Sequence, residues 1–427
     1  MKFAAIFVLF ANAFSAGMMF LISLLISRYG GKEIFGFFSV ILGLIVAATP
    51  VATFGMDAAI VRFLPVYRSE GRGSLVSRIQ RFVLFFSGSI SLLGGLGLAV
   101  LLVNFRGYDW GIGISTGVCL PLSVVLVVSQ GIIRANENVS IAVMPEAIVR
   151  PLIFSICISV FLFARMETLS LISIVFSYAI ALIFSNFFAF IVIIKKRYVD
   201  WNFESRIGFK DIRLWLNVGA SVVFSNISIS LINQSPVIVA GIVLSAFDAG
   251  EIGAVSRLAM LVSFALTAVN SIITPFLSRA IIVGDKMEVQ SIVTRAMAFS
   301  IFIAVPVCIV FYLFSPFLLS AFGADYLKAV PFLRIMLCAY VVHVAAGPSI
   351  SLLNISGLHK VTSRIMMLWT CLVLCGLLIS MTVYGISGGV LVAAISTAGY
   401  PLLLAVICYK ALGIDTTIFS LRFLLQR

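Results

Sequence analysis

Two ionisable residues four positions apart, Glu146 and Arg150, lie inside a long apolar stretch of this chain. On a helix, residues at this spacing lie on one face, so the carboxylate and the guanidinium would be neighbours. In one interpretation the two groups pair with each other and only hold helices together. In the other, Arg150 faces a water-filled cavity and binds an anion, while Glu146 tunes that site or carries a proton. Both interpretations stay open at this point.

Four further charged residues lie at the ends of apolar stretches. Asp57 and Arg62 lie near the end of the second stretch, Arg134 ends the fourth, and Arg257 begins the eighth. As interfacial arginines, all three can extend to lipid headgroups and act as anchors. Guanidinium groups also bind phosphate oxygens bidentately. Gathered with Arg150 around a central cavity, they would therefore suit a diphosphate.

The elements that must position these residues are membrane-spanning helices. About 20 residues cross the roughly 30 Å hydrocarbon core as a helix, and a spanning segment must satisfy its backbone hydrogen bonds internally. The sequence therefore predicts an all-α polytopic membrane protein with about 12 transmembrane helices. The predicted spans cover residues 3–26, 35–60, 82–104, 112–133, 140–163, 169–194, 216–245, 253–278, 296–321, 331–356, 365–384 and 387–409.

The positive charge of the chain alternates between its two predicted sides. Of 29 Lys and Arg residues, 21 lie at the termini or in the connections that share their side, seven lie opposite, and one is Arg150. Basic residues near short loops stay in the cytoplasm, so both termini are predicted to be cytoplasmic. The net charge of +13 is then explained by topology and anionic lipid headgroups. Nucleic acid is not expected as a partner.

The two halves of the chain resemble each other weakly. Residues 32–39 (KEIFGFFS) open the second span, and residues 249–256 (AGEIGAVS) open the eighth. Six helices return the chain to its starting side, so the halves would be parallel repeats. We expect pseudo-symmetric six-helix lobes over 1–194 and 216–427, joined by a cytoplasmic linker over 195–215. We expect a plain solvated linker; the alternative is a linker with a surface-lying stretch near Trp215.

Several signatures of other protein classes are missing from the sequence. It contains no GxxxxGK[ST] phosphate loop and no HExxH, nucleophile-elbow or EF-hand pattern. The predicted external loops are too short for a catalytic domain. All seven cysteines lie in apolar segments, so a disulfide framework is not expected. We therefore expect a transporter rather than an enzyme, with no cofactor and no metal site.

Short stretches along nearly the whole chain resemble a known family. They are residues 27–30 (SRYG), 35–39 (FGFFS), 54–55 (FG), 59–65 (AIVRFLP), 253–259 (GAVSRLA), 275–278 (PFLS), 322–326 (FGADY) and 353–360 (LNISGLHK). On these stretches the chain resembles polysaccharide (O-antigen-type) flippases of the multidrug/oligosaccharidyl-lipid/polysaccharide exporter superfamily. Each motif is degenerate and structural rather than catalytic.

The resemblance implies two six-helix lobes around a central cavity that work by alternating access. It also implies an undecaprenyl-diphosphate-linked oligosaccharide as substrate, a location in the bacterial inner membrane, and polysaccharide polymerase and chain-length proteins as partners. The substrate-binding arginines would be Arg150, Arg62, Arg257 and Arg134, and the coupling residues Glu146 and Asp57. The alternative is a cation-coupled multidrug exporter, in which Asp57 or Glu146 would bind hydrophobic cations.

The chain departs from relatives in that superfamily at two places. Drug/cation antiporters often carry an acidic residue within the first helix, where Asn12 is the most polar interior side chain of this chain. Many members also carry an Asp-Arg pair in the seventh helix, where this chain has Gln234, Ser235 and Pro236. Sites known from those members therefore do not transfer to these positions.

Overall fold

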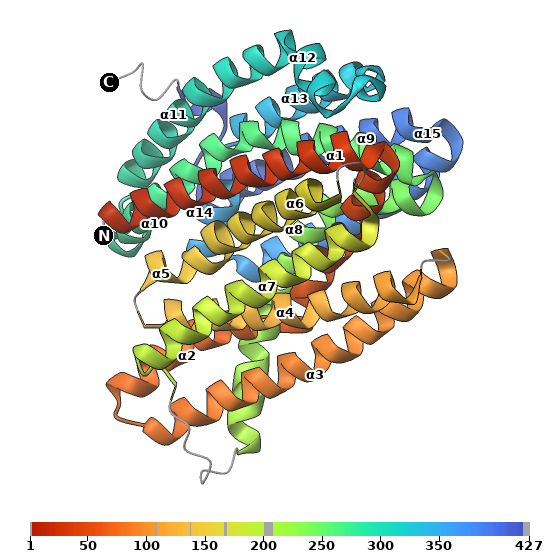
Figure 1. Cartoon of the computed structure of the whole chain (residues 1–427). Coiled ribbons are helices and arrows are strands. Elements are labelled where there is room, and N and C mark those ends of the chain that lie inside the picture. The colour runs from red at the N-terminus through yellow and green to blue at the C-terminus, as the bar shows by residue number, and fades with distance from the viewer. Residues whose placement is uncertain (1, 107–108, 137, 166–168, 200–207, 422–427) are drawn as a thin grey trace. The chain divides into compact units, whose positions relative to one another are not determined.

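The computed structural model describes residues 2–106, 109–136, 138–165, 169–199 and 208–421. Within these residues every regular element is helical (Figure 1). The first half holds α1 (Lys2–Thr53), α2 (Met56–Ser69), α3 (Gly73–Arg106), α4 (Trp110–Arg134), α5 (Val139–Met144), η1 (Pro145–Val149), α6 (Arg150–Arg165) and α7 (Leu171–Lys195). The second half holds α8 (Phe209–Val243), α9 (Ala246–Met260), η2 (Leu261–Ser263), α10 (Phe264–Val283), α11 (Lys286–Leu313), α12 (Ser315–Phe322), η3 (Ala324–Ala329), α13 (Val330–Ala345), α14 (Ser349–Ile355), α15 (His359–Leu412) and η4 (Ile418–Leu421).

Nine helical stretches in the described part of the chain are long and apolar enough to cross a membrane. Two of them are 48 and 54 residues long, more than twice the length that one crossing needs. Each contains a glycine with non-helical backbone angles, Gly31 in the first and Gly385 in the second. Each long stretch therefore holds two of the predicted spans. The predicted fold class, an all-α polytopic membrane protein, is confirmed.

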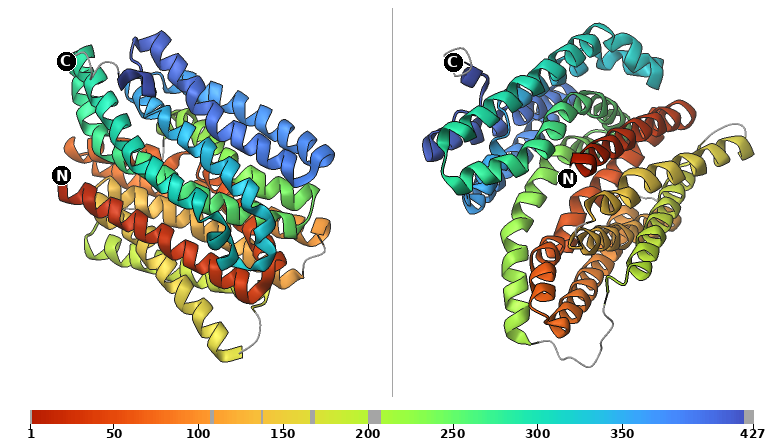
Figure 2. Two further views of the ribbon diagram at one scale, coloured as in Figure 1. Left: turned by 90° about the horizontal axis from the view of Figure 1, so that it is seen from above. Right: turned by 90° about the vertical axis from the view of Figure 1, so that its left-hand side faces the viewer.

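The second of these stretches, α15, is a helical hairpin that turns at Gly385. Its backbone angles there, φ 61° and ψ −146°, are accessible to glycine and strained for other residues. The two arms lie side by side in the blue part of Figure 2. They are joined by a hydrogen bond of 3.3 Å from Trp369 Nε1 to Ser396 Oγ. Small residues at the contact, such as Gly389 against Met381, let the arms approach closely.

Close contacts divide the chain into two compact units. Unit 1 comprises residues 1–30 and 41–230, and unit 2 comprises residues 31–40 and 231–427. In unit 1, α4 packs along both α3 and α7, and α6 packs along α7. In unit 2, α13 packs along α11 and α15, and α10 packs along α11. The lobes predicted from the sequence, with a boundary at 195–215, stay a prediction.

The segment 31–40 belongs to unit 2, although the chain before and after it belongs to unit 1. It contains the first of the two similar motifs, and it packs against the second. A Cβ placed on Gly36 would lie 1.7 Å from the Ala246 carbonyl oxygen, and one on Gly250 would lie 2.5 Å from the Lys32 carbonyl oxygen. Only glycine allows two helices to approach this closely. The two related helix openings are thus direct neighbours inside unit 2.

The alternative interpretation of the linker, a surface-lying stretch near Trp215, is wrong. Trp215 is completely buried in unit 1, on α8. Its indole Nε1 donates to the Tyr67 hydroxyl at 3.1 Å, and its ring centroid lies 5.5 Å from that of Phe82. The apolar surface of the indole is therefore buried against other side chains of unit 1 and does not contact lipid headgroups. The remainder of the predicted linker includes residues 200–207, which lie outside the described residues.

Candidate functional site

The Glu146–Arg150 pair lies where the fifth predicted span departs from regular α-helix. The chain passes from α5 into a single π-helical turn, η1, and then into α6. The Arg150 amide donates to the Pro145 carbonyl oxygen, five residues earlier. Pro151 explains the wider turn, because proline lacks an N–H and its ring conflicts with the carbonyl group four residues before it. Single π turns of this kind occur frequently at functional sites.

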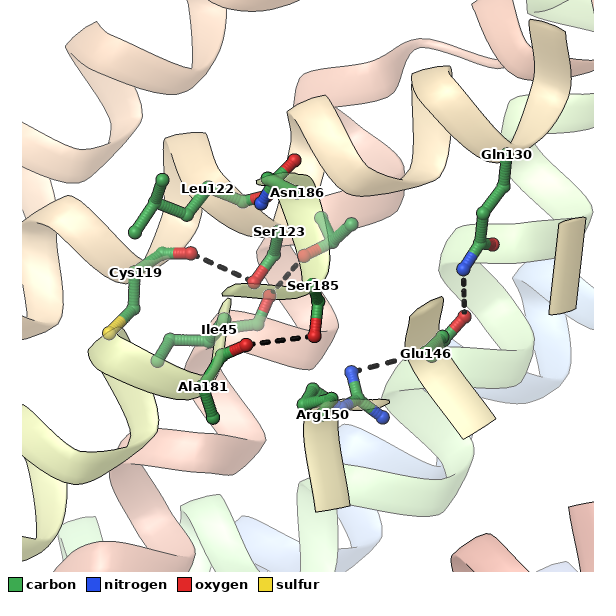
Figure 3. Close-up of polar contacts among 11 residues, drawn as sticks. Ile45, Cys119, Leu122, Ser123, Gln130, Glu146, Arg150, Ala181, Ser185 and Asn186 are labelled. Carbon is green, nitrogen blue, oxygen red and sulfur yellow. Dashed lines mark hydrogen bonds and ion pairs between the residues drawn. The ribbon is translucent and has the colours of Figure 1, made fainter. Parts of the chain in front are cut away.

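The structure brings the two charged side chains together and adds a third partner. Arg150 Nη1 lies 3.4 Å from Glu146 Oε1, and Gln130 Nε2 donates to Glu146 Oε2 at 3.1 Å (Figure 3). The Arg150 side chain is 19% exposed and that of Glu146 is 44% exposed. Arg150 Nε is buried and has no hydrogen-bond partner among the described residues. The guanidinium therefore retains unused donor capacity at Nε.

A buried phenol completes the surroundings of Arg150. Tyr178 of α7 is 3% exposed, and its hydroxyl shares hydrogen bonds with Arg150 and with Ser123 of α4. Ser123 Oγ in turn donates to the Cys119 carbonyl oxygen at 2.8 Å (Figure 3). The base of the guanidinium is thus held by a polar network, which fixes its position within unit 1.

The end of α4 links this pair to a second acidic residue, Asp57. Gly131 follows Gln130, and a Cβ placed on it would lie 3.3 Å from the Asp57 Cα. The last turn of α4 therefore packs directly on the start of α2. Arg134, at the end of that turn, interacts electrostatically with Asp57. Four residues singled out from the sequence, Asp57, Arg134, Glu146 and Arg150, thus border one end of α4 in unit 1.

The second predicted span, 35–60, does not continue to its expected end. Helix α1 stops at Thr53, because Phe54 and Gly55 adopt left-handed angles with φ of 48° and 66°. A Cβ on Gly55 would lie 2.4 Å from the Gly219 carbonyl oxygen, so a glycine is needed there. Asp57 consequently lies in the first turn of a new helix, α2. A carboxylate is favoured at that position by the helix dipole.

The remaining two predicted arginines occupy different surroundings. Arg62 is exposed on α2, and its guanidinium carbon lies 5.8 Å from the centroid of the neighbouring Phe63 ring. Arg257 is in unit 2, where its guanidinium carbon lies 5.4 Å from the centroid of the Phe35 ring. A cation over an aromatic face is stabilised by the ring quadrupole. Among the described residues of unit 1, no contact joins Arg62 to Asp57, Glu146 or Arg150, and Arg257 belongs to the other unit.

Two features of these polar surroundings were not predicted from the sequence. Gln130 lies one turn before Arg134 on α4, and this spacing could have indicated a second polar position on the same face. No pattern in the sequence identifies Tyr178 as a neighbour of Arg150, since a buried tyrosine is common in helical membrane bundles. In the described part of the chain, no three His, Cys, Asp or Glu side chains come together as metal ligands would.

One known protein family matches the greater part of the chain. Residues 4–281 match the family described as "Polysaccharide biosynthesis protein". No curated protein sequence matches the chain.

Solved structures of transporters share the fold. An inward-facing multidrug resistance MATE family transporter of the MOP superfamily has a TM-score of 0.75 at 16% identity, covering 96% of this chain and 99% of that one. A Vibrio cholerae MATE transporter has a TM-score of 0.67 at 16% identity, with 97% of both chains covered. A MOP superfamily transporter from Pyrococcus furiosus, described as having a binding pocket of reverse polarity, has a TM-score of 0.66 at 14% identity, with 96% and 95% covered. At these identities the likeness establishes the fold alone.

Proposed function

Because this chain belongs to the polysaccharide biosynthesis protein family, we propose that it is a flippase for a lipid-linked oligosaccharide. The substrate would be an undecaprenyl-diphosphate-linked repeat unit, moved across the bacterial inner membrane by alternating access. The product would serve the assembly of a surface polysaccharide such as O-antigen, capsule or exopolysaccharide. The transporter fold supports a carrier mechanism, and the sequence contains no phosphate loop that would supply energy from ATP.

The observation that carries this proposal is the state of Arg150. A cation inside a membrane span costs several kcal/mol unless it faces a partner or a cavity. Glu146 and Tyr178 occupy only part of the guanidinium, and the Nε–H has no partner among the described residues. A diphosphate presents several anionic oxygens with the geometry that a guanidinium binds bidentately. Arg150 is therefore our first candidate for the contact to the substrate phosphates.

The other charged residues would contact the substrate at other stages or couple transport to an ion gradient. Arg62 and Arg134 of unit 1 and Arg257 of unit 2 would contact the diphosphate at other stages of its passage. Glu146 and Asp57 would couple transport to an ion gradient. Glu146 suits this role because its carboxylate is half-exposed and lies beside Arg150.

Complementation of a deletion strain tests the proposal. Without the gene, the lipid-linked repeat unit should accumulate on the cytoplasmic leaflet, and surface glycan should be lost. Arg150→Ala should fail to restore surface glycan while it reaches the membrane at normal levels. Arg150→Lys should restore it partly, because an ammonium keeps the charge without the bidentate geometry.

Arg72→Ala is the matched control. Arg72 also pairs with a glutamate, Glu70, at 3.2 Å, but its side chain is 59% exposed. Exposed pairs of this kind contribute little, so this variant should complement fully. Normal surface glycan in the deletion strain would refute the flippase proposal. Full activity of Arg150→Ala would instead leave the Glu146–Arg150 contact with a structural role.

The second candidate function is a cation-coupled multidrug exporter. The solved structures of this fold include multidrug resistance transporters, and Glu146 offers a half-exposed carboxylate that a hydrophobic cation could approach. This function predicts that the deletion strain becomes sensitive to hydrophobic cations, and that Glu146→Gln fails to restore resistance. Unchanged drug sensitivity combined with loss of surface glycan would decide between the two in favour of the flippase.

The proposed orientation places both termini in the cytoplasm of a bacterial cell. It rests on the distribution of Lys and Arg along the loops. Polysaccharide polymerase and chain-length proteins are the proposed partners, because they would use the translocated unit. Reporter fusions at residue 427 and at the predicted external loop after residue 104 test the orientation. A periplasmic signal at the C-terminus would overturn it.

A further inference from the structure

A pocket with a volume of about 350 Å³ lies in unit 2, where the start of α11 meets the chain after α15. Its lining includes Lys286 and Gln290 of α11, and Asp415 and Ser420 from the C-terminal segment. These residues are remote in sequence from the Glu146–Arg150 site and play no part in the proposed function. By the predicted orientation, both elements lie at the cytoplasmic end of their spans.

The wall of this pocket is fixed by hydrogen bonds. Gln290 Nε2 donates to the Asp415 carbonyl oxygen at 2.7 Å, and the Asp415 amide donates back to Gln290 Oε1 at 2.9 Å. The next residue, Thr416, is fully buried, and its hydroxyl donates to the Ala346 carbonyl oxygen at 3.0 Å. The C-terminal segment is therefore docked on unit 2, and the pocket is formed before any ligand binds.

Three polar groups in the pocket are available to a ligand. Ser420 is 4% exposed, and its buried Oγ has no hydrogen-bond partner among the described residues. A buried hydroxyl without a partner is costly and indicates a missing ligand or water. Lys286 is exposed at the first position of α11 and carries a cation. Asp415 Oδ1 accepts from the Thr417 amide and hydroxyl, whereas no described group donates to Oδ2.

The pocket thus offers a cation and a hydroxyl for an anionic group, and a carboxylate oxygen for a cationic one. A purely anionic ligand would be repelled by Asp415, and a purely cationic one by Lys286. We propose that this pocket binds the phosphoethanolamine headgroup of a membrane phospholipid. The phosphate would contact Lys286 and Ser420, and the ammonium would donate to Asp415.

Two observations favour a lipid as the source of this headgroup. Large apolar side chains surround the pocket and are strongly exposed, Tyr409 at 63%, Phe419 at 66% and Met287 at 55%. Aromatic residues are enriched where a membrane protein meets the headgroup region, and the acyl chains would lie along these side chains. The volume is near the lower end of the range for ligand pockets, about 300–1,000 Å³. It therefore accommodates a headgroup rather than a whole lipid.

Native mass spectrometry of the full chain, with defined lipids added, tests the proposal. The lipids are phosphatidylethanolamine, phosphatidylcholine and phosphatidylglycerol with identical acyl chains. One phosphatidylethanolamine should be retained in preference to either of the others. Phosphatidylcholine keeps the positive charge but cannot donate a hydrogen bond to Asp415, and phosphatidylglycerol has no cation. We expect a preference of roughly ten-fold, as for a hydrogen bond between charged groups.

Two substitutions locate the site. Lys286→Gln should lower retention of phosphatidylethanolamine and phosphatidylglycerol alike, by roughly five-fold, as for a partly exposed ion pair. Asp415→Asn keeps an oxygen for Thr417 but should abolish the preference for phosphatidylethanolamine over phosphatidylglycerol. Lys410→Gln is the control, because Lys410 is exposed in the last turn of α15 and does not line the pocket. It should retain lipid as the wild type does.

Equal retention of the three lipids by the wild type would overturn the proposal. Identical behaviour of Lys286→Gln and Lys410→Gln would do so as well, since it would indicate adsorption to the basic surface in general. Glycerophosphoethanolamine separates a lipid from a water-soluble ligand. If it displaces the bound lipid as effectively as short-chain phosphatidylethanolamine at equal concentration, then the assignment to a membrane lipid is wrong.

Discussion

Lys32 Nζ lies 2.6 Å from Glu251 Oε2, and both side chains are nearly inaccessible to solvent, at 2% and 8% exposure. The two residues are 219 positions apart in the sequence. Lys32 also donates to the Asp325 carbonyl oxygen at 3.2 Å and lies 3.8 Å from the centroid of the Phe247 ring. One ammonium group thus joins the segment 31–40 to two other elements of unit 2, α9 and η3.

This ion pair predicts a large loss of stability when one partner is removed. Glu251→Gln leaves the Lys32 ammonium buried without a carboxylate, and breaking a buried pair in this way costs about 3–5 kcal/mol. The thermal unfolding midpoint of the purified protein should fall by several degrees. The double variant Lys32→Met with Glu251→Leu removes both charges and should regain most of the loss. A midpoint equal to that of the wild type in Glu251→Gln would contradict a buried pair.

The close packing of the same segment gives a second prediction. Gly36→Ala places a methyl group where a backbone oxygen of Ala246 already lies, 1.7 Å from the new carbon. Since backbone cannot yield as a flexible side chain can, the variant should be poorly folded and give little monodisperse protein. Gly17→Ala is the control, because a Cβ there meets no atom within 4 Å. That change should be neutral or slightly stabilising, as alanine favours a helix by about 1 kcal/mol over glycine.

Hydropathy alone was sufficient to predict most of the fold. Spanning helices must be long and apolar, so their presence follows from composition, and their approximate bounds follow from the charged loops. It could not predict the break after Thr53, because Phe54 and Gly55 lie within an apolar run. That break follows from the backbone contact of Gly55 with Gly219, which only the folded chain reveals.

The candidate site could be predicted only in part for a similar reason. Glu146 and Arg150 are four residues apart, so local helix geometry predicts their contact. The contact of Glu146 with Gln130, and that of Lys32 with Glu251, join residues on different helices. Lys32 and Glu251 lie in the two similar motifs, 32–39 and 249–256, which are far apart in the sequence. Their burial depends on partners that no local pattern identifies.

Tyr67→Phe tests the burial of Trp215. The change removes the only oxygen that accepts from the indole Nε1–H in the described structure, at 3.1 Å. A buried donor without a partner costs about 1–3 kcal/mol, so the unfolding midpoint should fall by a few degrees. Tyr29→Phe is the control, because Tyr29 is 48% exposed, and it should leave the midpoint unchanged. Equal midpoints for the two variants would mean that the indole N–H finds another acceptor.

Gln130→Leu tests the positioning of Glu146. The substitution keeps the volume of the side chain but removes the amide that donates to Glu146 Oε2 at 3.1 Å. The carboxylate then has Arg150 as its remaining partner, and we expect surface glycan export to fall by roughly five- to ten-fold, as for loss of one charge-assisted hydrogen bond. Gln80→Leu alters another buried glutamine, which donates to the Tyr198 carbonyl oxygen. Gln80→Leu should lower the unfolding midpoint but should leave glycan export per folded molecule nearly unchanged. Unimpaired export by Gln130→Leu would show that this contact is dispensable.

Pro151→Ala tests whether glycan export requires the π turn before Arg150. Alanine restores an N–H that can donate to the Ala147 carbonyl group, so the turn can relax to regular α-helix. Relaxation would remove the extra residue from the turn and rotate Glu146 relative to Arg150. We therefore expect an unchanged or higher unfolding midpoint together with reduced export of the lipid-linked glycan. Pro121→Ala, in the interior of α4, provides the comparison for removing a helix proline elsewhere in unit 1. If both variants export normally, then the π turn serves packing rather than the placement of the Glu146–Arg150 pair.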